Sequence, residues 1–184
     1  MKLEDFGYNE EIEKIRIENN CKDFEIGRVI AEHKERYMVK SEKGEIEAEI
    51  TGNLRFSAEG HEDFPTVGDW VALTIYGDDF SIIHKVLPRF SLISRRASGE
   101  FGQKQIIAAN VDFALLIQAI DGDFNINRLE RYLTICYSSK VNPIIVLTKI
   151  DLLNGQTVDD IIESIKRRIT NAPVIALSNK NKEG

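Results

Sequence analysis

The stretch VLTKIDL, residues 146–152, decides how the second half of the chain is expected to fold. An apolar run that begins at Val141 passes abruptly into Thr148, Lys149 and, one residue later, Asp151. A short aliphatic run of this kind predicts a buried strand. Because ligand sites of open α/β sheets lie beyond the carboxyl ends of their strands, we expect these polar residues to lie at a functional edge.

The residues on either side of this strand predict a parallel sheet with helical connections. Two further strands are predicted, a near-continuous apolar run that we interpret as buried, VDFALLIQAI (111–120), and PVIALS (173–178). NINRLERYLTICYSS (125–139) has helical spacing, and a Thr-x-x-Asp capping box opens a helix over 157–170. The order strand, helix, strand, helix, strand is typical of a parallel sheet with right-handed crossovers.

The first half of the chain has a different periodicity. Residues 8–20 predict a short helix with a solvated face. In GEIEAEI (44–50) the residues alternate, so Ile46, Ala48 and Ile50 are expected to face inward. Five short segments rich in β-branched and aromatic residues together predict a small β barrel. These segments are 24–33, 35–42, 44–52, 68–77 and 79–88.

Composition limits the classes of protein to consider. Hydrophobic residues make up 42% of the 184 residues, and the net charge is −6, so nothing overall indicates a nucleic-acid or membrane binder. Residues 1–63 are the acidic part, with 10 basic and 17 acidic side chains. Two widely separated cysteines, and a start that is too acidic and too poor in apolar residues for a signal peptide, predict a reduced, cytoplasmic protein. No apolar run approaches the roughly 20 residues needed to span a bilayer. The three histidines stand singly, so we expect no metal site in this chain.

Residues 89–105 are polar and contain glycine, and we predict an exposed loop or linker there. Arg95, Arg96 and Lys104 are opposed only by Glu100, so this segment is a candidate for contact with RNA phosphates. A solvated linker explains the same residues without a partner. Aromatic residues of the predicted barrel either stack on bases or fill its core, and the core explains most of them. They are Phe24, Tyr37, Phe56, Trp70, Tyr76 and Phe80.

The Thr-Lys-x-Asp string has a chemical interpretation. A carboxylate at a strand's end can accept two parallel hydrogen bonds from guanine, which offers adjacent donors at N1 and N2, whereas adenine does not. Asp151 is the candidate reader, Lys149 would lay its methylene stem along the base or ribose, and Thr148 would tie the loop to a neighbouring loop. An ordinary surface turn explains the string equally well.

A GTPase also needs the phosphate-binding pattern GxxxxGK[ST], and these 184 residues do not contain it. GEFGQKQ (99–105) has two glycines and a lysine, but the spacing is wrong and no strand is predicted before it. If the chain belongs to a GTPase, the order of its motifs must therefore be rearranged, with the phosphate loop after the guanine-binding motif.

Three motifs together resemble one family. AANVD (108–112), RLERYL (128–133) and TKID (148–151) are similar to the small-ribosomal-subunit-dependent GTPase A family, a circularly permuted GTPase family in which the guanine-reading motif precedes the phosphate loop. The likeness covers roughly residues 24–184. It implies a GTP hydrolase that uses Mg²⁺, carries a zinc module and acts in late maturation of the small ribosomal subunit. Its partners would be that subunit and ribosomal RNA, and the subunit would stimulate hydrolysis.

The resemblance also implies a domain plan and a set of site residues. The plan is a helical extension over 1–23, a five-stranded OB-fold over 24–92, a basic linker over 93–110, and the first βαβαβ part of a circularly permuted P-loop GTPase domain over 111–184. The guanine-binding positions fall on Thr148, where many members have Asn, and on Lys149 and Asp151. The family's Ser-Ala motif falls on Ile175, Ala176 and Leu177, so a backbone contact to guanine O6, from Ala176, is expected.

Gly184 falls where the family is still leading into its phosphate loop, so we expect a fragment, monomeric and inactive by itself. Such a piece should bind GTP weakly, because phosphate and Mg²⁺ contacts would be missing, and neither Mg²⁺ nor zinc would be ligated by it. The rival interpretation is a non-catalytic OB-fold module that binds RNA or protein beside an inert α/β platform. A third interpretation treats the α/β part as a receiver domain or a Rossmann-like domain. The sequence lacks the acidic cluster of a receiver domain and the glycine fingerprint of a Rossmann-like domain. GxxxxGK[ST] within about 40 residues downstream in the gene would favour the GTPase.

Overall fold

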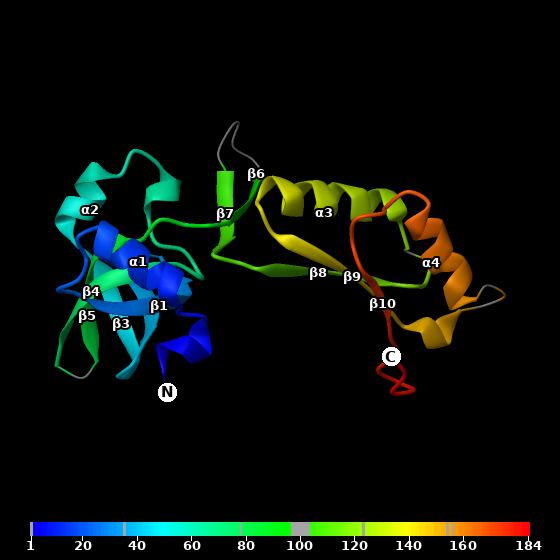
Figure 1. Ribbon diagram of the computed structural model, residues 1–184, viewed down its shortest axis with the longest axis horizontal. Coiled ribbons are helices and arrows are strands. Elements are labelled where there is room, and N and C mark those ends of the chain that lie inside the picture. The colour runs from blue at the N-terminus through cyan, green and yellow to red at the C-terminus, as the bar shows by residue number, and fades with distance from the viewer. Residues whose placement is uncertain are drawn as a thin grey trace. The chain divides into compact units, whose positions relative to one another are not determined.

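A computed structural model describes residues 2–34, 36–77, 79–96, 104–122, 124–153, 155 and 157–184, and for Arg96 and Lys104 the backbone alone. The chain divides into two compact units, Met1–Asn110 and Val111–Gly184 (Figure 1). Each unit has its own hydrophobic core, as expected when a chain forms more than one domain. Both free cysteines, Cys21 and Cys136, are buried.

The first unit contains a closed five-stranded barrel, which confirms the predicted fold. The strands lie in the order β1, β2, β3, β5, β4, and only the β3–β5 pair is parallel. Closure removes the free strand edges that a five-stranded sheet would otherwise expose. The strands are β1 (Glu25–His33), β2 (Arg36–Ser41), β3 (Gly44–Ile50), β4 (Trp70–Tyr76) and β5 (Phe80–Val86).

Aliphatic residues fill the barrel. The expected alternation on β3 is present, because Ile46 and Ala48 are buried, at 3% and 0% exposure, and Ile50 packs against the core. Tyr37 and Trp70 are buried as predicted. The core interpretation is wrong for other aromatic residues, since Phe56 is 92% exposed and lies on a short helix that the sequence did not indicate, α2 (Gly52–Ser57). Tyr76 and Phe80 are also exposed, and Phe24 is partly buried.

A second small core joins the start of the chain to the barrel. A 3-10 helix, η1 (Leu3–Phe6), is followed by the predicted helix α1 (Glu10–Glu18), which begins where the Asn9 side chain accepts a hydrogen bond from the Ile12 amide. Leu3 and Ile12 pack with Trp70 of β4. Apolar packing therefore fixes this described part of the extension, residues 2–23, to the barrel. A second 3-10 helix, η2 (His61–Asp63), precedes β4.

The segment predicted as a loop or linker instead contains an antiparallel ribbon, so that prediction is wrong for part of it. β6 (Leu92–Arg96) pairs with β7 (Lys104–Ala109), with Arg96 opposite Lys104. The sequence did not indicate these strands, because neither has the strict alternation of apolar and polar residues that identifies a half-buried strand. Residues 97–103 of this segment lie outside the described residues.

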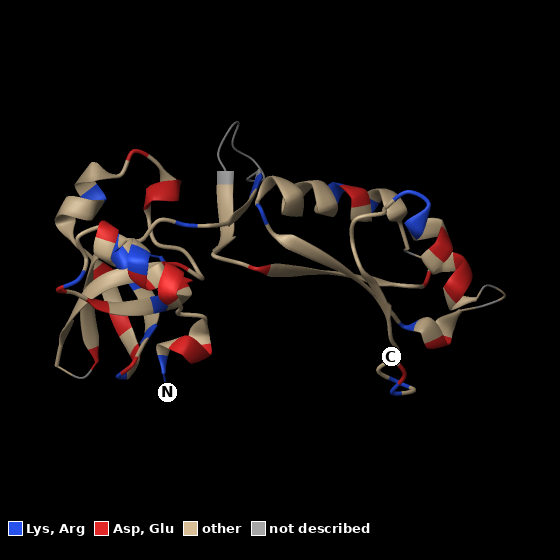
Figure 2. Ribbon diagram, viewed as in Figure 1, with Lys and Arg blue, Asp and Glu red and all other residues tan. Residues whose placement is uncertain are grey.

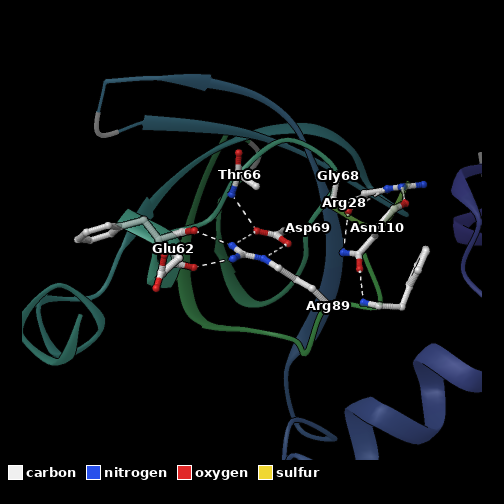
Figure 3. A network of polar contacts seen from close by, with 9 residues as sticks. Arg28, Glu62, Thr66, Gly68, Asp69, Arg89 and Asn110 are labelled. Carbon is white, nitrogen blue, oxygen red and sulfur yellow. Dashed lines mark hydrogen bonds and ion pairs between the residues drawn. The ribbon is translucent and has the colours of Figure 1, made fainter. Parts of the chain in front are cut away.

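Polar contacts hold both ends of this ribbon to the barrel (Figure 3). The fully buried Asp69 carboxylate accepts two hydrogen bonds from the Arg89 guanidinium, at 2.8 and 2.6 Å, and one from the Thr66 amide at 2.8 Å. At the other end, the Asn110 side-chain amide donates to the Gly68 backbone carbonyl at 3.1 Å, and the Asn110 backbone carbonyl accepts from the Arg28 guanidinium at 2.8 Å. Desolvation offsets much of the attraction in a buried ion pair, but removing one partner would leave the other charge buried and unpaired.

The second unit is a three-stranded parallel sheet with two helices, in the predicted order of elements. The strands lie in the order β10, β9, β8, and α3 and α4 supply the core residues that pack on Ile145 and Leu147 of β9. The Thr157–Asp160 capping box is present, and α4 ends at Lys166, before the predicted residue 170. The elements are β8 (Phe113–Ala119), α3 (Ile126–Ser138), β9 (Asn142–Thr148), η3 (Ile150–Leu152), α4 (Val158–Lys166) and β10 (Val174–Ala176).

One face of this sheet is not covered by the described residues, so the prediction that β8 is buried is wrong. Phe113, Leu115 and Ile117 are 62%, 59% and 60% exposed, and Ile175 of β10, on the same face, is 47% exposed. The reason is that both helices contribute their apolar residues to the core on the opposite face. We call this set of four side chains the open sheet face.

Candidate functional site

The carboxyl ends of β8, β9 and β10 bring the predicted site residues together. β9 ends at Thr148, and Lys149 adopts a left-handed backbone conformation, with φ 60°, that turns the chain into η3. The turn is closed by a hydrogen bond of 2.9 Å from the Leu152 amide to the Lys149 carbonyl. A left-handed residue other than Gly, Asn or Asp is uncommon, and such residues cluster at functional turns.

Asp151 is directed toward the end of the neighbouring strand β10. Its Oδ1 accepts a hydrogen bond of 2.6 Å from the Ser178 hydroxyl, and its Oδ2 lies 3.9 Å from the Lys180 ammonium. The side chain of Asp151 is 10% exposed. The hydrogen bond from Ser178, followed by the nearby charges of Lys180 and Lys149, holds the pKa of Asp151 below its ordinary value. The carboxylate is therefore ionised near neutral pH and acts as a hydrogen-bond acceptor.

Thr148 and Lys149 connect this loop to the end of β8. The Thr148 hydroxyl donates to the Gln118 carbonyl at 3.4 Å, so threonine provides a tie between neighbouring segments. The Lys149 ammonium lies 3.3 Å from the Asp121 carboxylate and its side chain is 56% exposed. Both contacts come from the same end of the parallel sheet, where the sequence placed them.

The predicted backbone contacts after β10 are only partly free to bind a ligand. The Leu177 amide donates to the Leu147 carbonyl at 2.9 Å, so this N–H is already used within the structure. Ala176, the last residue of β10, pairs in register with Leu147. Ile175 is exposed on the open sheet face.

Ser178 is a site residue that sequence reasoning missed. It is 1% exposed, donates to Asp151, and accepts from the Asn181 amide at 3.2 Å. Backbone hydrogen bonds between Ser178 and Glu183, at 2.9 and 3.2 Å, close the turn that follows. The signal was the serine that ends the predicted strand 173–178, but the Ser-Ala motif was matched three residues earlier.

The basic residues proposed for RNA contact are only partly described. Arg95 is exposed on β6, and its guanidinium donates to the Gln105 side chain of β7 at 3.0 Å. The side chains of Arg96 and Lys104 lie outside the described residues. The backbone pairing of β6 and β7 places all three on one ribbon.

Two further properties of the described part of the chain bear on function. It contains no group of three or more His, Cys, Asp or Glu side chains placed to hold a metal ion. Among its helices, none has the length and apolar character that crossing a membrane requires. An ionised, hydrogen-bonded carboxylate beside two lysines is suited to a planar ligand that offers N–H donors to Asp151 and negative charge or oxygen acceptors to the lysines.

The first unit contains a closed barrel, and the second contains a three-stranded parallel sheet with this loop at its carboxyl edge. Two solved structures share the fold. YloQ, described as a circularly permuted GTPase, has a TM-score of 0.64 and 23% identity, and the match covers 87% of this chain and 53% of YloQ. YjeQ from Thermotoga maritima has a TM-score of 0.66 and 21% identity, covering 87% of this chain and 54% of YjeQ.

Sequence comparison gives the family. The model of the family described as RsgA GTPase matches residues 86–184. The small ribosomal subunit biogenesis GTPase RsgA 1 of Oceanobacillus iheyensis is 39% identical over 160 residues, covering 86% of this chain and 45% of the relative. RsgA 2 of Lactiplantibacillus plantarum is 42% identical over 127 residues, covering 69% of this chain and 36% of the relative. The chain belongs to the RsgA GTPase family, and it spans about half the length, or less, of these curated relatives.

Proposed function

We propose that these residues form the guanine-reading part of a GTPase that acts in maturation of the small ribosomal subunit. Membership of the RsgA family supports this proposal, since curated relatives are named small ribosomal subunit biogenesis GTPases. The single observation that supports the base-reading role best is the 2.6 Å hydrogen bond between Ser178 and Asp151. It fixes an ionised carboxylate at the shared edge of β9 and β10, where ligands of parallel sheets bind.

In this proposal Asp151 accepts hydrogen bonds from N1–H and N2–H of guanine. A base without these two donors would leave the charge unpaired, and a buried polar group without a partner costs about 1–3 kcal/mol or more, so adenine is rejected. Lys149 covers the base or ribose with its stem, and Thr148 keeps the loop in place through Gln118. We propose that guanine O6 accepts a hydrogen bond from a backbone N–H of Ala176 or of the turn after Ser178. The Leu177 N–H is not available, because it donates to the Leu147 carbonyl.

The nucleotide's phosphates have no partner in this proposal within residues 1–184. The pattern GxxxxGK[ST], which supplies backbone N–H groups and a lysine to the phosphates, does not occur in this sequence. We therefore propose that the 184-residue chain binds GTP or GDP weakly and does not hydrolyse GTP. Hydrolysis, Mg²⁺ and a zinc ion are proposed for the whole protein, with ligands from other residues.

For the partner we propose the small ribosomal subunit, contacted through RNA by the β6–β7 ribbon with Arg95, Arg96 and Lys104. The domains follow the plan given by the resemblance, with an extension over 1–23, an OB-fold over 24–92, the ribbon segment over 93–110 and the partial GTPase domain over 111–184. The protein is proposed to act in the cytoplasm as a monomer. Exposure of Arg95 and its place on a structured ribbon support an RNA contact.

Titration of the ¹⁵N-labelled 184-residue chain with GDP tests the base-reading proposal. We expect millimolar GDP to shift the amide signals after β9 and β10, and the same concentration of ADP to shift them far less, because only guanine offers paired donors. Asp151→Ala should abolish the guanine preference, and Asp159→Ala, which removes an exposed carboxylate elsewhere in the same unit, should keep it. Equal shifts with both nucleotides would leave the loop as an ordinary turn and favour a non-catalytic binding module.

A further inference from the structure

A groove on the N-terminal extension is a second candidate binding site, separate from the base-reading loop. It has a volume of about 610 Å³ and lies between η1 and one side of α1. Its floor includes the Tyr8 ring and Ile17, and Ile17 is 47% exposed. Together, the Tyr8 ring and the exposed part of Ile17 leave apolar surface open to a ligand.

The groove is formed before anything binds in it. The ring of Tyr8 packs edge-on against Trp70 at 5.1 Å, and its hydroxyl donates to Glu13. Burial, together with this hydrogen bond, raises the pKa of Tyr8 to about 12, so the hydroxyl stays a neutral donor. On the η1 side, the Phe6 carbonyl accepts a hydrogen bond from Arg28. Because both walls are tied to the barrel, a ligand would not have to order them, which lowers the cost of binding.

The rim of the groove is acidic. It carries four glutamates, Glu4, Glu10, Glu13 and Glu18, and one lysine, Lys14. Glu4 and Glu10 make no ion pair with any described residue, and the pair between Lys14 and Glu18 is long, at 3.8 Å, with both side chains mostly exposed. Figure 2 shows acidic residues on η1 and at both ends of α1, with the basic residues between them. An exposed pair of this kind is weak, so a ligand's cation can replace Lys14.

We propose that this groove binds a short basic segment of a partner polypeptide, which places an apolar side chain on Ile17 and Tyr8 and cations near Glu10 and Glu18. Charge complementarity selects this occupant, because the acidic rim repels RNA phosphates and anionic membranes at long range. The apolar floor selects a polypeptide over a simple cation.

The dimensions of α1 predict the spacing of the segment. Glu10 and Glu18 are eight residues apart, which is about 12 Å along an α-helix. In an extended peptide, residues i and i+4 are about 13 Å apart and point to the same side, with residue i+2 between them. A segment with the pattern basic, any, apolar, any, basic therefore fits the groove.

The test measures binding of a fluorescently labelled peptide, SRSLSRS, to the 184-residue chain by anisotropy at low ionic strength. We expect saturable binding that weakens as salt is added, because rim charges are screened. A peptide with both arginines replaced by glutamate should not bind, and a peptide with leucine replaced by serine should bind about tenfold more weakly, since one aliphatic anchor is lost. A seven-nucleotide RNA should not compete. Absence of saturable binding, or competition by the RNA, would overturn the proposal.

Variants on α1 separate a local contact from net charge. Glu10→Lys should weaken binding of SRSLSRS about tenfold, because an attraction becomes a repulsion at the rim. Glu11→Lys makes the same change of charge one residue along the same helix, outside the groove lining, and should change affinity less than about twofold. Ile17→Ser should weaken binding without altering its salt dependence. Equal effects of Glu10→Lys and Glu11→Lys, with circular dichroism showing both folded, would contradict a site in the groove.

Discussion

At the scale of single residues, the base-reading loop depends on how Asp151 is held. Ser178 supplies the shortest contact, at 2.6 Å, and comes from the segment after β10, 27 positions further along the chain. The sequence predicted Thr148, Lys149 and Asp151 because they directly follow an apolar run. It did not predict Ser178, because a hydrophobic pattern does not fix a strand's last residue to within three positions, and the partner of a polar side chain depends on that position.

Replacing Ser178 with alanine should raise the pKa of Asp151 toward its ordinary value, because the hydrogen bond from Ser178 is the largest cause that lowers it. A carboxylate with a depressed folded-state pKa stabilises the fold above its unfolded-state pKa, and this stabilisation is lost as pH falls through the folded-state value. Ser178→Ala should therefore reduce the acid-side loss of stability. NMR titration of the Asp151 carboxyl carbon measures the shift. Ser138→Ala is the control and should leave the shift unchanged, because the Ser138 hydroxyl donates to the Ile135 carbonyl within its own helix.

At the scale of elements, local patterns predicted those parts whose partners are near in sequence or whose periodicity is strong. The barrel strands and the βαβαβ order were predicted because alternation, turn residues and helical spacing are local signals. The β6–β7 ribbon was missed because its stability comes from contacts with the barrel. Asp69 and Arg89 are 20 positions apart, and Gly68 and Asn110 are 42 positions apart. Phe56 was assigned to the core because hydrophobicity alone does not show that a short helix between two strands leaves its phenylalanine in solvent.

The close approach of β7 to the start of β4 gives a prediction about the ribbon. Gly68 has φ +95°, and a Cβ there would lie 2.0 Å from the Ala109 carbonyl oxygen, so the backbone would have to move. Gly77 has φ +66° and no atom within 4 Å of such a Cβ. Gly77→Ala should cost about 1–2 kcal/mol of unfolding free energy from backbone strain alone, and Gly68→Ala at least about 2 kcal/mol more. Urea denaturation of the two variants gives the difference, and equal losses would mean that the ribbon moves away from the barrel without cost.

At the scale of the whole molecule, the distribution of apolar surface separates the two units. The first unit closes its barrel and covers a second small core with α1, whereas the second unit covers only one face of its sheet with described residues. A parallel sheet is ordinarily covered on both faces, which is why its strands read as continuous apolar runs. The sequence of β8 has that character, but a run of apolar residues does not show whether the chain supplies a cover.

The open sheet face should bind the dye ANS when the 184-residue chain is fully folded. Leu115 and Ile117 lie two residues apart on the same face of β8, and each is about 60% exposed. Replacing both residues with threonine removes apolar surface, so ANS fluorescence should fall. Threonine is common in strands, so the unfolding free energy should change by less than about 1 kcal/mol. Ile145→Thr, on the helix-covered face, is the matched control and should cost about 2–4 kcal/mol, since Ile145 is fully buried. If the double variant unfolds as readily as Ile145→Thr, the face is covered in solution and the exposure of β8 does not hold for the folded chain.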